Sequence, residues 1–339
     1  MSSTTPLALT MGEPGGIGAE LALKAWLARR DEAVPPFLVI DDPARLTGMA
    51  RALGLACAIV PIEAPGETFA RFVHGLPVLP LGLSVAATLG LAEPKNAPAV
   101  IGSIERAVKL VQAGEAAAVV TSPIQKQSLY AAGFKHPGHT EFLAQLAGGD
   151  ITPVMMLACD ALRVVPVTIH LPLAKAVAAL SQQAIEHCGR VTAEALNRDF
   201  GIAKPRLAVA GLNPHAGEAG SLGREEIEII KPAIETLRRE GLDISGPFPA
   251  DTMFHAIARQ RYDAALCMYH DQALIPLKTI DFDGGVNVTL GLPFVRTSPD
   301  HGTALDIAGK GVASPTSLIA ALKLARAMAD ARQQHGHHR

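Results

Sequence analysis

Three histidines each follow a strand-like run of hydrophobic residues and stand beside turn-forming residues. His170 ends the segment VVPVTIH, His215 follows RLAVAGLNP, and His270 follows AALCMY. A polar residue directly after a buried strand lies at the edge of a sheet, where open α/β folds place their binding sites. Three imidazoles converging from three strand ends, with room for substrate, would form a catalytic metal site. Any one of these histidines alone is better explained as an ordinary strand-end or core residue, and only the repeated context favours a metal.

Polar residues close to these histidines in the sequence could complete such a site. Asp271 follows His270 directly and could either orient an imidazole ring or accept a proton, and Glu218 could also orient a ring. Lys278 lies further along the same segment and could reach a phosphate group.

Further residues suit an anionic substrate. His139 and Thr140 stand at a predicted helix start, where backbone N–H groups could hold a phosphate or carboxylate and Thr140 could cap the helix. Asn287 and Arg296 are polar residues in an otherwise buried, strand-like stretch. A buried arginine needs an anionic partner, either a ligand phosphate or an internal carboxylate. Simple capping explains the first pair equally well.

Two glycine-rich segments could approach a ligand closely. TMGEPGGIGAE, residues 10–20, lacks both the glycine spacing of a dinucleotide fingerprint and the lysine of a P-loop. A tight turn explains it as well as a binding role involving Glu13 does. DHGTALDIAGKG, residues 300–311, offers His301, Gly302 and Asp306 and is a reasonable loop for the adenine and ribose of a cofactor.

Strand-like and helix-like segments alternate along the chain, which predicts a mostly parallel sheet covered on both faces. At 339 residues the chain exceeds the size at which single cores usually stop growing, so we expect two lobes. We place the first α/β lobe at residues 1–131 and 303–339, and the second lobe, with the candidate metal ligands, at residues 132–302. The predicted strands include 6–10, 37–41, 154–157, 162–168, 207–212, 264–268 and 286–289, and the longer predicted helices are 17–29, 43–53, 97–113, 181–200, 224–240 and 315–332.

The composition favours a protein with a large buried core in a reducing compartment. Hydrophobic residues make up 49% of the chain and charged residues 18%, and the net charge of −2 argues against a nucleic-acid surface. The four cysteines are far apart and show no disulfide pattern, which favours free thiols. We see no secretory signal and no apolar run that could span a membrane, so we expect a cytoplasmic protein.

The order and spacing of several motifs resemble the 4-hydroxythreonine-4-phosphate dehydrogenase family, NAD-dependent enzymes of pyridoxal 5′-phosphate biosynthesis. The most specific motifs are GHTEFLA, TIHLPL, GLNPHAGE, PADTMF, MYHDQALIPLK and NVTLGLPFVRTSPDHGTA, and the likeness covers nearly the whole chain. The chain departs from the family pattern at Glu13 and Gly15, where Asp and Ala are usual, and at Ala219 and Ser221. These changes leave the candidate metal ligands intact but could adjust the shape of the substrate site.

The resemblance implies an isocitrate/isopropylmalate dehydrogenase-like fold, with two α/β/α lobes and an active-site cleft between them. It also implies a homodimer with a shared active site, in which the second lobe forms the dimer interface and the partner subunit donates one metal ligand. The implied divalent metal is zinc, magnesium, manganese or cobalt, held by His170, His215 and His270. The resemblance further implies that substrate is bound by His139, Thr140, Lys278, Asn287 and Arg296, and that His301, Gly302 and Asp306 lie near NAD.

The implied reaction is the oxidation of 4-phosphohydroxy-L-threonine at C3, with Asp271 or Lys278 as the base. The resulting β-keto acid loses CO2 to give 3-amino-2-oxopropyl phosphate. The main alternative is a dehydrogenase of threonate or erythronate 4-phosphate in sugar-acid catabolism. A cyclic diol substrate fits the expected phosphate-binding residues less well, and the three histidines argue against a phosphate acyltransferase or a non-catalytic binding protein. The sequence leaves the choice between NAD and NADP open.

Overall fold

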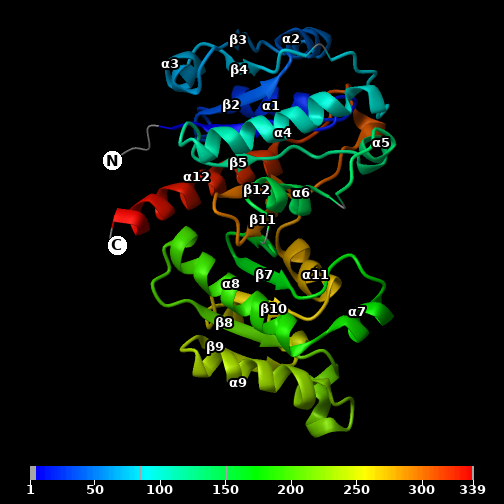
Figure 1. Cartoon of the computed structure of the whole chain (residues 1–339), viewed down its shortest axis with the longest axis vertical. Coiled ribbons are helices and arrows are strands. Elements are labelled where there is room, and N and C mark those ends of the chain that lie inside the picture. Colours follow the sequence, from blue (N-terminus) through cyan, green and yellow to red (C-terminus); the bar gives the residue numbers. More distant parts are fainter. Residues whose placement is uncertain (1–4, 84, 137, 150, 338–339) are drawn as a thin grey trace. The chain divides into compact units, whose positions relative to one another are not determined.

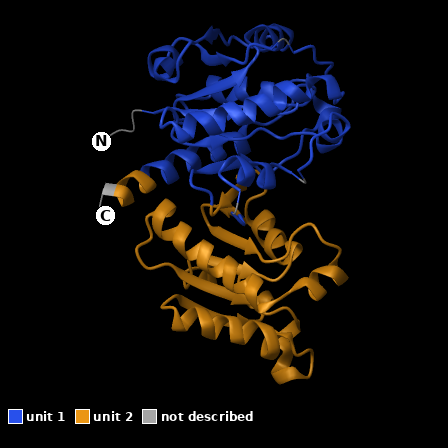
Figure 2. Cartoon of the chain, viewed as in Figure 1, with its two compact units in different colours: residues 1–153, 292–330 blue, residues 154–291, 331–339 orange. Residues whose placement is uncertain are grey.

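The protein divides into two compact units in the computed structural model, which describes residues 5–83, 85–136, 138–149 and 151–337 (Figures 1 and 2). Unit 1 comprises residues 1–153 and 292–330, and unit 2 comprises residues 154–291 and 331–339. By their contacts, residues 132–153 and 292–302 belong to unit 1 and residues 331–339 to unit 2, whereas we expected the first two segments in the second lobe and the third in the first lobe. The division into a first lobe and a second lobe with the metal ligands and dimer interface stays a prediction.

Unit 1 is built on parallel strands, as the alternation of elements predicts. Every strand pair of this unit runs parallel, from β3 at one edge to β12. The strands in spatial order are β3 (Ile59–Pro61), β4 (Leu76–Pro80), β2 (Phe37–Asp41), β1 (Leu7–Thr10), β5 (Val119–Val120) and β12 (Arg296–Pro299).

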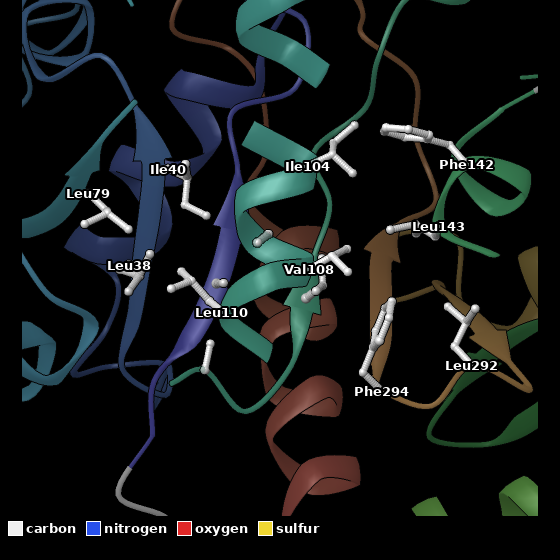
Figure 3. Packing of buried hydrophobic residues seen from close by; sticks show 14 of the residues in the cluster. Leu38, Ile40, Leu79, Ile104, Val108, Leu110, Phe142, Leu143, Leu292 and Phe294 are labelled. Atoms are coloured by element: carbon white, nitrogen blue, oxygen red, sulfur yellow. The ribbon is translucent and has the colours of Figure 1, made fainter. Parts of the chain in front are cut away.

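Helices cover the sheet of unit 1, and the longest that lies wholly within this unit, α4 (Ala97–Gln112), shows why. Its apolar residues Ile104 and Val108 lie one turn apart and join a buried cluster with Phe142 and Phe294 (Figure 3). Burying side chains of this size stabilises the fold by roughly 1.5–3 kcal/mol each. The remaining α-helices are α1 (Gly18–Leu27), α2 (Pro43–Ala52), α3 (Thr68–Phe72), α5 (Lys126–Ala131), α6 (His139–Leu146) and α12 (Thr316–His337), of which α12 continues into unit 2.

Unit 2 has a mixed sheet that combines a hairpin with parallel strands. The strands β6 and β7 pair antiparallel and are joined by a turn at Asp160 and Ala161. The strands β7, β10, β8 and β9 then run parallel, and β11 pairs antiparallel with β6. The order is β11 (Val286–Leu290), β6 (Val154–Cys159), β7 (Leu162–Pro166), β10 (Ala264–Cys267), β8 (Arg206–Ala210) and β9 (Asp243–Phe248).

The helices of unit 2 begin largely where the sequence predicts. Ser181 caps α8 (Gln182–Phe200) by accepting a hydrogen bond from the N–H of Ala184 (3.2 Å), and Gly201 ends the helix in the left-handed conformation. The predicted helix 224–240 opens instead with a π-helical turn at Glu226–Ile230, and α9 (Lys231–Arg239) follows it. Pro232 cannot donate a backbone hydrogen bond at this junction, since it has no N–H. The other α-helices are α7 (Leu173–Ala179), α10 (Ala256–Arg259) and α11 (His270–Ile280).

A buried carboxylate fastens the last turns of α12 to the C-terminal end of α8. Asp199 is 2% exposed and accepts two hydrogen bonds from Arg332 (2.7 and 2.8 Å) and two from Arg198 (2.8 and 3.0 Å). Although burial raises the pKa of Asp199, the two guanidinium groups outweigh it and hold the pKa below its usual value. This carboxylate is therefore ionised at neutral pH and its charge is compensated.

No helix in the described part of the chain is long and apolar enough to cross a membrane.

Candidate active site

The three histidines follow three neighbouring parallel strands of unit 2. β10 lies between β7 and β8, and His170, His270 and His215 follow β7, β10 and β8, respectively. Because parallel strands end at the same edge of a sheet, the three residues follow strand ends at one edge, and their convergence on a metal stays a prediction.

Two of the three imidazoles lie close together. The ring centroids of His170 and His270 are 6.2 Å apart. Two imidazoles bound to one tetrahedral zinc ion would have centroids roughly 5 Å apart, given Zn–N distances of about 2.0–2.1 Å. Among the described residues, no group of three His, Cys, Asp or Glu side chains is close enough to hold a metal ion. In this conformation His215 does not complete a three-histidine cluster.

The donor chemistry around His270 nevertheless fits a metal ligand. Nδ1 of His270 lies 2.7 Å from Oδ1 of Asp271, a contact that leaves Nε2 available for coordination. The imidazole side chains of His170 and His215 are on exposed residues, so a metal could reach them. Imidazole nitrogen suits zinc and cobalt among the expected metals.

The backbone at His170 and His215 is strained. Both residues have a positive φ, 54° and 53°, which is uncommon for residues other than glycine. At His215 the strain extends over a left-handed turn that runs through Ala219. The left-handed conformation costs roughly 1–2 kcal/mol for each non-glycine residue, so the surrounding structure must stabilise this turn.

The carboxylate that contacts the His215 loop is Glu226, which sequence reasoning did not identify. Glu226 is 1% exposed, and its oxygens accept hydrogen bonds from the backbone N (2.7 Å) and from Nδ2 (3.0 Å) of Asn213. Glu218, which we expected to orient a ring, is exposed. In the sequence, Glu226 belongs to a helical segment whose acidic residues are spaced to form surface ion pairs. Its burial therefore could not be predicted from that pattern.

In unit 1, a buried cation lies at the start of β12. Arg296 is 4% exposed, and its Nη2 and Nε donate to Oγ1 of Thr121 (2.6 and 3.2 Å). Burial lowers the pKa of Arg296 to about 10, so the group remains charged at neutral pH. Thr121 follows β5, which pairs with β12, and only the fold reveals this contact.

His139 lies in the electrostatic field of Arg296. Burial lowers its pKa well below the usual value, and the positive charges of Arg296 and Lys126 lower it further. The imidazole is therefore neutral at pH 7, and its Nε2 is buried without a hydrogen-bond partner among the described residues. A neutral imidazole would approach an anionic group as a hydrogen-bond donor and not as a cation.

The remaining substrate-binding candidates occupy regular elements. Thr140 is the second residue of α6, and the helix is capped at Gly138, so the prediction that Thr140 is the N-cap is wrong. Thr140 cannot cap the helix because it lies inside the first helical turn, after the N-cap position. Lys278 lies in the last turn of α11, with Nζ 5.4 Å from the ring centroid of Phe282, and Asn287 lies on β11.

The glycines of the first motif accommodate other parts of unit 1. A Cβ atom on Gly15 would lie 1.9 Å from the carbonyl oxygen of Leu91, and one on Gly16 would lie 2.7 Å from that of Thr303. Glu13 is 3% exposed and its Oε2 accepts a hydrogen bond from Oγ of Ser128 (3.2 Å). Burial raises the pKa of Glu13 despite its hydrogen bonds. These contacts favour the tight-turn interpretation of the motif.

The candidate cofactor loop, residues 300–311, is anchored at its end by α1. Oε1 of Glu20, which is fully buried, accepts hydrogen bonds from the N–H of Ala313 (3.0 Å) and from Nζ of Lys24 (2.8 Å). Lys24 also donates to the carbonyl oxygens of Gly311 (2.9 Å) and Ala313 (2.7 Å).

The residues expected to contact the cofactor lie within that loop. His301 is half-buried, with Nδ1 2.9 Å from the carbonyl oxygen of Gly302. Gly302 and Asp306 are exposed, and a Cβ atom on Gly302 would meet open space. Ala304 between them has a positive φ of 44°, a third place where a candidate binding segment carries backbone strain.

The sequence profile of the pyridoxal phosphate biosynthetic protein PdxA matches residues 33–325. The chain belongs to this family. A PdxA relative from Bradyrhizobium diazoefficiens, named 4-hydroxythreonine-4-phosphate dehydrogenase, is 54% identical over 338 residues, covering 96% of this chain and 98% of the relative. The resemblance seen in the motifs is thereby confirmed.

Solved structures agree with this assignment. The 4-hydroxythreonine-4-phosphate dehydrogenase of Klebsiella pneumoniae has a TM-score of 0.84 and 36% identity, and covers 96% of this chain and 99% of its own. A terephthalate 1,2-cis-dihydrodiol dehydrogenase from Burkholderia xenovorans is more distant, with a TM-score of 0.64, 27% identity and coverage of 95% and 98%. The predicted dehydrogenase fold class is confirmed.

Proposed function

We propose that this PdxA-family chain is an NAD- and divalent-metal-dependent dehydrogenase that oxidises 4-phosphohydroxy-L-threonine at C3. The product is a β-keto acid that loses CO2 to give 3-amino-2-oxopropyl phosphate, a step in pyridoxal 5′-phosphate formation. The observation that carries the proposal is the placement of three histidines after three adjacent parallel strands in a chain of this family. The names of its close relatives support the same reaction.

His170, His215 and His270 would hold the metal, which when bound supplies a Lewis acid for the C3 hydroxyl and the enolate formed on decarboxylation. Asp271 would accept a hydrogen bond from Nδ1 of His270, so that the lone pair of Nε2 could bind the metal. This contact favours an orienting role for Asp271 over the role of base, and leaves Lys278 as the other candidate for proton transfer.

The phosphate of the substrate would be bound by charge and by hydrogen-bond donors. Arg296 supplies a buried positive charge and neutral His139 a donor, and Thr140, Lys278 and Asn287 would complete the phosphate and amine contacts. Such binding energy, gained far from the reacting carbon, positions C3 for hydride transfer. NAD would supply the hydride acceptor, with His301, Gly302 and Asp306 beside it.

The same proposal includes a cytoplasmic homodimer whose shared active site receives one metal ligand from the partner subunit. A ligand donated across the interface would account for the incomplete three-histidine cluster in the single chain.

The test is NADH formation, followed by absorbance, with the purified protein, NAD and a panel of substrates before and after chelation. We expect metal-dependent NADH formation with 4-phosphohydroxy-L-threonine, and loss of turnover in His270→Ala. NADH formed only from threonate or erythronate 4-phosphate would move the protein to sugar-acid catabolism. NADH formed only from a cyclic cis-dihydrodiol would place it with the more distant relative. If none of the substrates gives NADH, the dehydrogenase assignment is refuted.

A further inference from the structure

One buried acidic side chain holds the loop that carries His215. The Glu226 carboxylate accepts hydrogen bonds from both the backbone N–H and the side-chain amide of Asn213, two residues before His215. The same amide also donates to Oε2 of Glu225 (2.7 Å). These three hydrogen bonds tie the entrance of the loop to the helical segment that follows it.

The loop backbone closes around this carboxylate. A Cβ atom on Gly217 would lie 2.5 Å from Oε2 of Glu226, and a Cβ atom on Gly211 would lie 3.2 Å from Oε1. The first distance is too short for any real side chain, and Gly217 also has a φ of +78°. The carboxylate therefore lies in a space formed by glycine backbone at two points of the loop, one on each side of His215.

A second buried side chain extends this arrangement to the end of β10. Gln272 is 8% exposed, and its Nε2 donates to the carbonyl oxygen of Gly211 (2.7 Å). Its Oε1 accepts a hydrogen bond from the N–H of Met268 (2.7 Å). Two hydrogen bonds through one amide thus connect the strand end before His215 with the strand end before His270.

We propose that Glu226 is a positioning residue for metal binding, which holds the left-handed turn at His215 and thereby fixes the backbone from which this imidazole projects. The inference rests on the proposed function, because it requires His215 to be a metal ligand. His215, Ala216, Glu218 and Ala219 all disfavour the left-handed conformation they adopt, so contacts outside the turn must maintain it. Glu226 supplies hydrogen bonds at the entrance of the turn, and its carboxylate fills the space beside Gly217 at the centre.

The direct test is Glu226→Gln, with the affinity for Co²⁺ measured by titration of the metal-free protein. Glutamine keeps the shape of the side chain but replaces one acceptor oxygen with an NH2 group, which would face a donor of Asn213. We expect the dissociation constant for Co²⁺ to rise by roughly 10- to 100-fold, as for other groups that support a metal ligand. The matched control is Glu228→Gln, which makes the same charge change at a side chain that is 57% exposed, and should bind Co²⁺ like the wild type.

A thermodynamic cycle separates positioning from general stabilisation. If Glu226 acts through His215, Glu226→Gln should weaken Co²⁺ binding in the wild-type background and cause no further weakening in a His215→Ala background. A residue that only stabilises the fold would lower the unfolding temperature in both backgrounds and leave the Co²⁺ affinity unchanged, which would overturn the inference.

Three further outcomes decide the remaining cases. If Glu226→Gln does not fold, Asn213→Ala removes only the side-chain donor and should weaken Co²⁺ binding in the same direction; wild-type affinity in that variant would overturn the positioning role. If the wild-type protein itself binds no Co²⁺, the proposed metal site fails, and the positioning role fails with it. Wild-type binding with an unaffected Glu226→Gln variant overturns the positioning role alone.

Discussion

Substituting Thr121 with valine should weaken substrate binding although Thr121 is not itself expected to touch the substrate. The Thr121 hydroxyl accepts hydrogen bonds from Nη2 and Nε of Arg296 at 2.6 and 3.2 Å, and the residue is fully buried. Valine has nearly the same shape but no acceptor, so the guanidinium group loses two hydrogen bonds that help to orient it within unit 1.

The size of the effect follows from the charge on Arg296. A hydrogen bond to a charged group contributes about 1.5–3 kcal/mol, and about 1.4 kcal/mol corresponds to a tenfold change. If this contact positions the guanidinium group for the substrate phosphate, kcat/KM of Thr121→Val should fall between about tenfold and about a hundredfold. Because the loss concerns substrate binding, we expect it mainly as a higher KM for the phosphorylated substrate.

The neighbouring strand offers a matched control. Thr297 is also fully buried, but its hydroxyl donates to the carbonyl oxygen of Ala321 (2.9 Å) on α12 and not to Arg296. Thr297→Val should lower the free energy of unfolding by about 0.5–1.5 kcal/mol and leave KM unchanged. Steady-state kinetics and denaturant unfolding of both variants check the reasoning. Equal kcat/KM values in the two variants would refute the role assigned to Thr121.

Two further predictions concern the carboxylates that anchor α12 and the candidate cofactor loop. Asp199→Asn should destabilise unit 2 by about 3–5 kcal/mol at pH 7, because two arginines lose a buried partner. The pKa of Asp199 is lowered from 3.8 in the folded protein, so its stabilising contribution is present above pH 3.8 and is lost as the pH falls through the lower folded value. Urea unfolding should therefore show a smaller difference between the variant and the wild type at pH 3, and a constant difference would contradict this. Glu20→Gln should raise the KM for NAD several-fold with little change in the KM for the phosphorylated substrate, because it weakens the contacts through Lys24 and Ala313 that hold residues 311–313. Initial-rate kinetics with each substrate varied in turn would check this, and an equal rise in both KM values would contradict it.

Local patterns were sufficient to predict much of the fold and part of the site. Alternating strands and helices predicted the parallel arrangement of unit 1, and the two predicted strands at 154–157 and 162–168 correspond to the paired strands β6 and β7. That His170, His215 and His270 follow three neighbouring strands is in line with one rule, that parallel strands end at the same edge of a sheet. Each of these predictions depends on residues that are close in sequence or on the regular geometry of a sheet.

The missed features depend on contacts between distant segments. Thr121 meets Arg296 only because β5 and β12 are paired, and Glu226 is buried only because the His215 loop folds back over it. Gly15 looks like part of a ligand-binding turn, yet its missing side chain makes room for the backbone at Leu91. No spacing along the chain distinguishes a glycine that admits a ligand from one that admits another loop.

The central claim is that three histidines after adjacent strands bind one metal ion, and X-ray diffraction from zinc-soaked crystals tests it most directly. Data collected on both sides of the zinc absorption edge would locate the zinc ion without any assumption about which residues bind it. We expect one anomalous peak bonded to imidazole nitrogens of His170, His215 and His270 at about 2.0–2.1 Å, with one of these ligands supplied by the second subunit of the dimer. A zinc ion bound elsewhere, or at this edge without His215, would contradict it.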